Sequence, residues 1–71
     1  MVTDMKIIGA RIRAARKARG LRQEDVALAS GVGVRFVHDL ERGKPSVEMD
    51  RVLRVVEAVG LEIHFDERPG P

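Results

Sequence analysis

The apolar residues of the chain fall into four stretches with helical spacing, separated by turns that contain glycine. In the first stretch, Ile8, Ile12 and Ala15 follow one another at intervals of three or four residues. This spacing places them on one face of a helix over about 5–19. Asp4 precedes this predicted helix as a candidate N-terminal cap.

Three shorter helices are predicted downstream of the first. Residues 23–30 carry small apolar side chains that suit close packing, and residues 34–42 place apolar residues on one side and polar residues on the other. The stretch over about 48–59 holds more apolar positions than one core-facing stripe needs. We therefore expect this last helix to pack against two partners.

The periodicity changes after Gly60. Leu61, Ile63 and Phe65 alternate with charged or polar residues, which is the two-residue repeat of a half-buried β-strand over 61–66. No second segment has this pattern, and a lone strand leaves its backbone N–H and C=O groups unpaired. The sequence therefore predicts an all-α domain of four helices with a C-terminal β-strand that pairs across a homodimer.

The size of the chain also favours a homodimer. The sequence has 71 residues, of which 44% are hydrophobic and 34% are charged, and we expect one globular domain over 1–71. A core of this size supplies only a few kcal/mol of stability, so a second subunit is an expected supplement. The predicted dimer contacts come from the strand and from the surplus face of the last helix. These residues are Leu61, Ile63, Phe65, Val55 and Val59.

The composition argues against several other classes of protein. There is no cysteine for a disulfide or a zinc site, and His38 and His64 alone are too few for a metal centre. No stretch reaches roughly 18 apolar residues, and the charged N-terminal region is unlike a secretory signal, so we expect a cytoplasmic location and no membrane partner. Without a recognisable catalytic motif, we expect neither enzymatic activity nor a cofactor.

The charges are unevenly distributed, although the net charge is only +2. Residues 1–22 contain seven basic residues and one acidic residue, which gives a net charge of +6. Residues 23–45 carry −1 and residues 46–71 carry −3. A strongly positive end suits a polyanionic partner, although an arginine-rich, solvated helix face accounts for the same charges.

Residues 23–42 form the most informative unit, because two short helices joined by a glycine-containing turn are typical of a helix-turn-helix. The chain here resembles the Cro and lambda-repressor-like family of bacterial regulators, through Leu21-Arg22-Gln23-Glu24-Asp25-Val26-Ala27, Gly31-Val32 and Leu40-Glu41-Arg42-Gly43. The resemblance spans about residues 8–60 and implies a four-helix, lambda-repressor-like fold that binds double-stranded DNA. Arg22 and Gly33 depart from the family pattern, because they stand where side chains usually cap the two helices.

In a helix-turn-helix, the N-terminal outer face of the third helix enters the major groove. Val34, Arg35 and His38 are then the predicted base contacts, with Val34 on a thymine methyl group and Arg35 donating two hydrogen bonds to guanine. An alternative for Arg35 is an ion pair with Asp39, four residues on, which adds only about 0.2–0.5 kcal/mol. For His38 the alternative is an exposed side chain without a role.

The resemblance implies that Gln23 binds a DNA phosphate at the start of the second helix, where free N–H groups favour an anion. Three basic residues flank the same face and are further predicted phosphate contacts: Arg22, Arg42 and Lys44. A solvated face of the first helix is expected for Arg11, Arg13 and Lys17. The resemblance also implies a structural ion pair between Arg16 and Glu41 that ties the first helix to the end of the third.

A narrower resemblance links the chain to HipB-type antitoxins. It rests on four helices and a closing strand, with Glu41-Arg42-Gly43-Lys44-Pro45-Ser46-Val47 before the last helix and Val59-Gly60-Leu61-Glu62-Ile63-His64-Phe65 after it. This resemblance implies a homodimeric repressor that binds an inverted-repeat operator and a HipA-type serine/threonine kinase toxin. Two alternatives remain open: a free-standing repressor of the same fold, and a protein-interaction module whose DNA binding is secondary.

Overall fold

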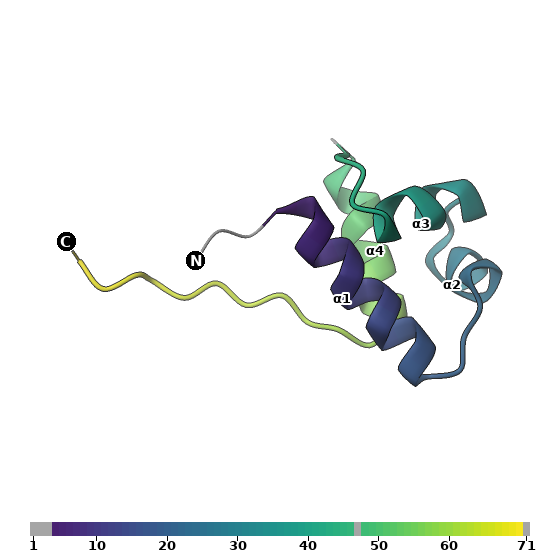
Figure 1. Cartoon of the computed structure of the whole chain (residues 1–71), viewed down its shortest axis with the longest axis horizontal. Coiled ribbons are helices and arrows are strands. Elements are labelled where there is room, and N and C mark those ends of the chain that lie inside the picture. The colour runs from purple at the N-terminus through teal and green to yellow at the C-terminus, as the bar shows by residue number, and fades with distance from the viewer. Residues whose placement is uncertain (1–3, 47, 71) are drawn as a thin grey trace.

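The computed structural model describes residues 4–46 and 48–70, which form four helices followed by an extended C-terminal segment (Figure 1). The helices are α1 (Met5–Ala18), α2 (Gln23–Ser30), α3 (Val34–Glu41) and α4 (Met49–Ala58). α3 packs against α1 and α2, and α2 also packs against α4. The predicted all-α, four-helix architecture is confirmed, with each predicted helix end within one residue of the observed end. Val47, in the sequence motif before α4, and Pro71, the end of the predicted domain, lie outside the described residues.

Local sequence signals set the ends of the helices. Asp4 caps α1, because its carboxylate accepts a hydrogen bond from the Ile7 N–H at 3.0 Å. α2 ends at Gly31, whose φ of 70° lies in the left-handed region that glycine adopts without steric cost. Arg42 was expected inside the third helix but is its C-terminal cap, with its N–H directed at the carbonyls of the last turn. Among the described residues, no helix is long and apolar enough to cross a membrane.

The core lies between the four helices and contains nine buried apolar side chains among the residues that the structure describes. They are Ile12, Val26, Ala27, Val37, Leu40, Val52, Val55, Val56 and Val59. Val55 and Val59, which we expected at a dimer contact, are fully covered within this chain because they belong to this core. The surplus apolar face of α4 is formed instead by Met49 and Leu53, whose exposed fractions are 55% and 46%.

The C-terminal segment leaves the helices as an extended chain (Figure 1). Leu61 is half-buried and its N–H donates to the Val56 carbonyl at 3.0 Å, but Ile63 is 44% exposed and Phe65 is 94% exposed. No β-strand occurs among residues 4–46 and 48–70, so the strand predicted over 61–66 is not observed. The physical reason is that a strand needs a hydrogen-bonded neighbour, and the described part of one chain offers this segment none.

Candidate nucleic-acid interface

α2 and α3 form a helix-turn-helix whose geometry depends on the turn between them. After Gly31, the Val32 N–H donates to the Ala27 carbonyl at 3.1 Å and closes the end of α2. Ala27 is only 5% exposed, and its small side chain permits close packing at this point. The buried Ser30 hydroxyl donates to the Val26 carbonyl at 2.6 Å. These contacts hold the start of α3 in a fixed position against α2.

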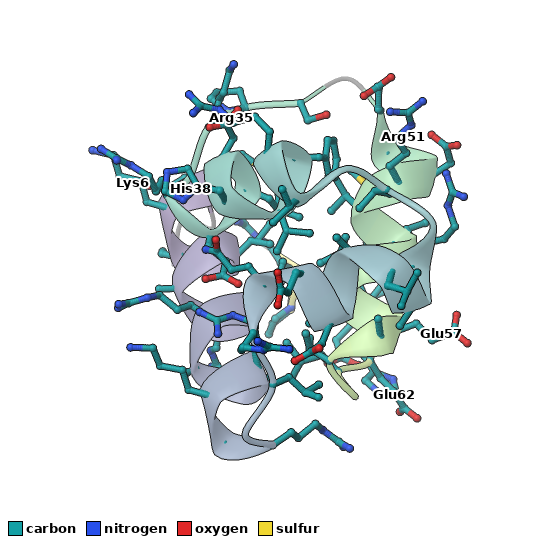
Figure 2. The ribbon with its side chains drawn as sticks, turned by 90° about the vertical axis from the view of Figure 1, so that its right-hand side faces the viewer. Lys6, Arg35, His38, Arg51, Glu57 and Glu62 are labelled. Carbon is teal, nitrogen blue, oxygen red and sulfur yellow. The ribbon has the colours of Figure 1, made fainter. Side chains whose placement is uncertain are left out.

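α3 has one face in the core and one face open to solvent. Val37 and Leu40 are buried, whereas Val34 is 50% exposed and the Arg35 side chain is 83% exposed. His38 is only partly exposed, so it is less accessible than a residue on a fully solvated face. Figure 2 shows Arg35 and His38 at the same edge of the molecule. The N-terminal half of α3 therefore offers accessible side chains to a partner.

The Arg35 side chain is already paired on its own helix. Its Nε lies 3.2 Å from Asp39 Oδ1 and donates to Asp39 Oδ2 at 3.4 Å, so the intrahelical ion pair is formed. Lys44 Nζ lies 3.6 Å from Asp39 Oδ2. One carboxylate thus faces both a predicted base contact and a predicted phosphate contact.

The N-terminus of α2 carries Arg22 together with two acidic side chains. Arg22 Nη1 lies 2.8 Å from Glu24 Oε1, and the Arg22 side chain is 75% exposed. Because an arginine side chain has no acceptor, the cap of α2 comes from Asp25, whose carboxylate accepts a hydrogen bond from the Arg22 N–H at 2.8 Å. This hydrogen bond holds the pKa of Asp25 below its ordinary value. Gly33, at the corresponding position of α3, provides no side-chain cap.

A buried hydrogen-bond network lies beside Gln23. Arg16 Nε and Nη2 donate to the two carboxylate oxygens of Glu41 at 2.7 and 3.0 Å, and Arg16 Nη1 donates to the Leu21 carbonyl at 2.7 Å. The hydrogen bond to Glu41 raises the pKa of Arg16 above its ordinary value. Gln23 Nε2 donates to Glu41 Oε1 at 3.2 Å. The structure therefore brings Arg16 and Glu41 together and adds Gln23 to the pair, a contact that the sequence pattern did not indicate.

Two further basic side chains lie near the C-terminal end of α3. Arg42 is exposed at the C-terminal cap. Lys6, which we did not single out from the sequence, is exposed on α1 close to Gly43, where a β-carbon would lie 2.7 Å from Lys6 Cα. Figure 2 shows Lys6 at the same edge as His38. Only the excess of basic residues before residue 23 pointed toward Lys6.

The described residues contain no candidate metal centre, because no three His, Cys, Asp or Glu side chains among them gather around one point. The acidic groups on α3 are instead paired with basic side chains. Asp39 faces Arg35 and Lys44, and Glu41 faces Arg16. Both acidic side chains of α3 are thus paired with basic neighbours.

Comparison with known proteins finds helix-turn-helix proteins in each case. Residues 7–66 match a family model described as a helix-turn-helix domain. The chain is 46% identical over 56 residues to an uncharacterized HTH-type transcriptional regulator, y4mF, of Sinorhizobium fredii, and this match covers 79% of the chain and 74% of that protein. It is 33% identical over 54 residues to the HTH-type transcriptional regulator DdrOP3 of Deinococcus deserti, a match that covers 76% of the chain but only 42% of that protein.

A solved structure has the same arrangement of helices. The restriction-modification controller protein C.AhdI from Aeromonas hydrophila superposes with a TM-score of 0.73 at 34% sequence identity, covering 82% of this chain and 88% of that one. The likeness in sequence and the likeness in fold therefore extend over most of both chains.

Proposed function

The chain belongs to the Cro and lambda-repressor-like family of helix-turn-helix DNA-binding regulators, and from this we propose that it is a repressor that binds an inverted-repeat operator as a homodimer. The observation that carries the proposal is the outer side of α3. Val34 and Arg35 are exposed there, while Val37 and Leu40 anchor the helix in the core. A helix that is fixed on its inner face and carries a forked cation outside suits the reading of guanine in the major groove.

The proposed DNA contacts fall into two groups, those to base edges and those to backbone phosphates. Val34, Arg35 and His38 read base edges, which determines the sequence preference. The phosphate contacts supply affinity and salt dependence without sequence information. We assign them to Arg22, Gln23, Arg42 and Lys44.

Selection from a pool of double-stranded DNA with a randomised central stretch tests the proposal. The expected product is an inverted repeat whose half-sites lie about 34–36 Å apart. Arg35→Ala should relax the preference at one base position in each half-site. Gln23→Ala or Arg42→Ala should weaken binding to all sequences, and only Arg42→Ala, which removes a positive charge, should also flatten the salt dependence. If Arg35→Ala kept the wild-type preference, α3 would not be the recognition helix.

The proposed dimer contact lies at the C-terminal segment. Ile63 and Phe65 are exposed on it, and a groove of about 400 Å³ adjoins its first residues. This groove is lined by parts of α1 and α4 together with residues 61–64. Antiparallel pairing with the same segment of a second copy would satisfy the backbone groups that one chain leaves unpaired.

The second partner that we propose is a HipA-type serine/threonine kinase, which makes this chain the antitoxin of a toxin–antitoxin pair. The resemblance to HipB-type antitoxins motivates this step, and the charge of −3 over residues 46–71 supports it. Glu57 and Glu62 lie at the opposite side of the view from Arg35 (Figure 2), where an acidic surface avoids repulsion by bound DNA. Solubility alone also explains exposed acidic residues.

Similarity to a restriction-modification controller favours the second candidate, a free-standing repressor without a kinase partner. Co-expression with the product of the adjacent gene, followed by gel filtration, separates the two candidates. An antitoxin should co-elute with the kinase, and Glu57→Lys with Glu62→Lys should weaken the complex. Absence of such a gene, or failure to co-elute, would leave the free-standing repressor. A pure protein without salt-dependent operator binding would instead be an interaction module.

A further inference from the structure

Asp39 connects two kinds of predicted DNA contact on one side of α3. Arg35 Nε lies 3.2 Å from Asp39 Oδ1 and donates a hydrogen bond to Asp39 Oδ2 at 3.4 Å. Lys44 Nζ lies 3.6 Å from Asp39 Oδ2. The Asp39 side chain is only 22% exposed, whereas the Arg35 side chain is 83% exposed and the Lys44 side chain 69% exposed. The Asp39 carboxylate is therefore more buried than the two longer basic side chains that contact it.

The nitrogen of Arg35 that pairs with Asp39 determines which N–H donors of Arg35 remain available to a ligand. An arginine has five N–H donors, and Nε carries one of them. Nε is the Arg35 nitrogen that the described residues engage, which leaves the donors of both terminal amino groups for a ligand. Guanine presents O6 and N7 side by side, so two terminal amino groups approaching end-on make the bidentate contact.

We propose that Asp39 is a specificity-determining residue that positions Arg35 for end-on recognition of guanine. The inference rests on the proposed DNA-binding function and adds a residue to its recognition surface. Fixing Nε before binding removes rotamers that Arg35 would otherwise lose on contact with the base. The same carboxylate lowers affinity for DNA of any sequence, because its charge repels phosphate and holds Lys44.

Helix stability gives little reason for an acidic residue at this place. Asp39 lies in the C-terminal half of α3, where the helix dipole disfavours a carboxylate. A carboxylate that serves only as a helix-stabilising partner of Arg35 would also leave the sequence preference unchanged when removed. The two roles therefore differ in a measurable property, the ratio of the affinities for matched and mismatched DNA.

The test uses DNA selected from the randomised pool, a copy changed at the base pair that Arg35 reads, and an unrelated duplex. Asp39→Ala should lower the preference for the matched site, which a bidentate contact raises by about 5- to 150-fold. Binding to the unrelated duplex should become tighter, and its salt dependence steeper by about one phosphate contact. Asp39→Asn should give the same tighter unspecific binding with a smaller loss of preference.

Two controls accompany these variants. Glu57→Gln removes the same charge from α4, away from Arg35 (Figure 2), and should change neither quantity. In an Arg35→Ala background, Asp39→Ala should no longer affect the preference at that base pair, because the side chain that it positions is gone. Circular dichroism melting curves establish that every variant is folded.

The outcomes separate the inference from the proposed function. If Arg35→Ala loses the preference but Asp39→Ala keeps it, the positioning role is overturned and the proposed function stands. A uniform gain in affinity for all three duplexes with Asp39→Ala also overturns it, because Asp39 would then act through its charge alone. If the wild-type protein selects no sequence from the pool, both the inference and the proposed function fail.

Discussion

Three arginines of this domain have different surroundings, and these surroundings decide what each one is able to bind. Arg16 is nearly covered and directs three guanidinium nitrogens at Glu41 and at a backbone carbonyl. Arg22 and Arg35 are mostly exposed and pair with acidic side chains across solvent-accessible contacts. Exposed pairs of this kind contribute only about 0–1 kcal/mol, so Arg22 is able to exchange a carboxylate for DNA. Arg35 needs no such exchange, because its pair with Asp39 uses Nε and leaves the terminal amino groups for DNA, whereas Arg16 has all three nitrogens engaged.

Removal of Glu41 should destabilise the fold far more than removal of Asp39, an acid whose partners Arg35 and Lys44 are mostly exposed. Glu41→Ala leaves the Arg16 charge buried without its partner, and we expect the free energy of unfolding to fall by about 3–5 kcal/mol. Urea unfolding followed by circular dichroism measures this loss. Asp39→Ala is the matched control, with an expected change of about 0–1 kcal/mol. A Glu41→Ala variant as stable as the wild type would show that the pair adds nothing.

Gly9 should respond to alanine with the opposite sign to an ordinary helix position. Alanine within a helix is normally more stable than glycine by about 0.5–1 kcal/mol. At Gly9, however, a β-carbon would overlap the Leu40 carbonyl oxygen and lie 2.8 Å from the Glu41 carbonyl oxygen, because α1 meets the last turn of α3 there. We therefore expect Gly9→Ala to lower the melting temperature. Ala14→Gly, at an exposed position of α1, gives the ordinary propensity effect for comparison, and a stabilised Gly9→Ala would contradict the close approach.

At the scale of elements, the helices were predictable because their signals are local. Asp4 and Gly31 mark helix ends within a few residues of the atoms that they satisfy, and apolar spacing identifies the buried face of each helix. The alternation over 61–66 is also a local signal, but a strand exists only when another strand pairs with it, so the pattern alone was insufficient.

The candidate interface shows the same division between local and distant contacts. The Arg35–Asp39 pair spans four residues of one helix and was foreseen as an alternative. Gln23 and Glu41 are 18 residues apart, and their hydrogen bond exists only because α3 folds back onto the start of α2. Lys6 likewise approaches the end of α3 through packing between helices. Contacts of this second kind require the tertiary structure.

The N-terminus of α2 should make the stability of the domain sensitive to acid. The Asp25 carboxylate accepts a hydrogen bond from the Arg22 N–H, and this bond lowers the pKa of Asp25 from its ordinary value of 3.8. The ionised form therefore stabilises the folded state above the ordinary pKa, and this contribution is lost as the pH falls through the lowered pKa of the folded state. Below about pH 4, the free energy of unfolding should fall more steeply for the wild type than for Asp25→Asn.

Equilibrium unfolding at a series of pH values measures this difference. Asp50→Asn, which removes an exposed carboxylate from the first turn of α4, should keep the steep fall of the wild type. Parallel curves for the wild type and Asp25→Asn would contradict the capping role of Asp25.

At the scale of the whole molecule, one chain leaves apolar side chains on two parts that do not cover each other. Met49 and Leu53 are exposed on α4, while Ile63 and Phe65 lie on a segment that projects from the helices (Figure 1). This projection makes the molecule 44 Å long against 24 and 18 Å in the other directions. In the proposed homodimer, a two-fold axis would place the C-terminal segment of one chain beside the same segment of the second chain, where Ile63 and Phe65 would gain apolar neighbours. The same symmetry would present two recognition helices to an inverted repeat.

Removal of the C-terminal segment should therefore separate the subunits without unfolding them. Truncation after Leu61 keeps the half-buried side chain and the bond from its N–H to Val56 but removes Ile63 and Phe65. We expect the truncated chain to be monomeric by sedimentation equilibrium at micromolar concentration, and the same result for Ile63→Asp combined with Phe65→Asp. Each monomer retains α3, so binding to one half-site should persist while the added affinity for the complete inverted repeat is lost.

The matched control for this experiment is Leu28→Asp, which places a charge on an exposed leucine of α2 and should leave the association unchanged. Circular dichroism distinguishes a folded monomer from an unfolded chain in each variant. A truncated protein that remained dimeric would move the interface to the exposed side chains of α1 and α4, Ile7, Met49 and Leu53. In that case the segment would be dispensable for dimerisation, and its alternation of apolar and charged residues would have to serve another partner.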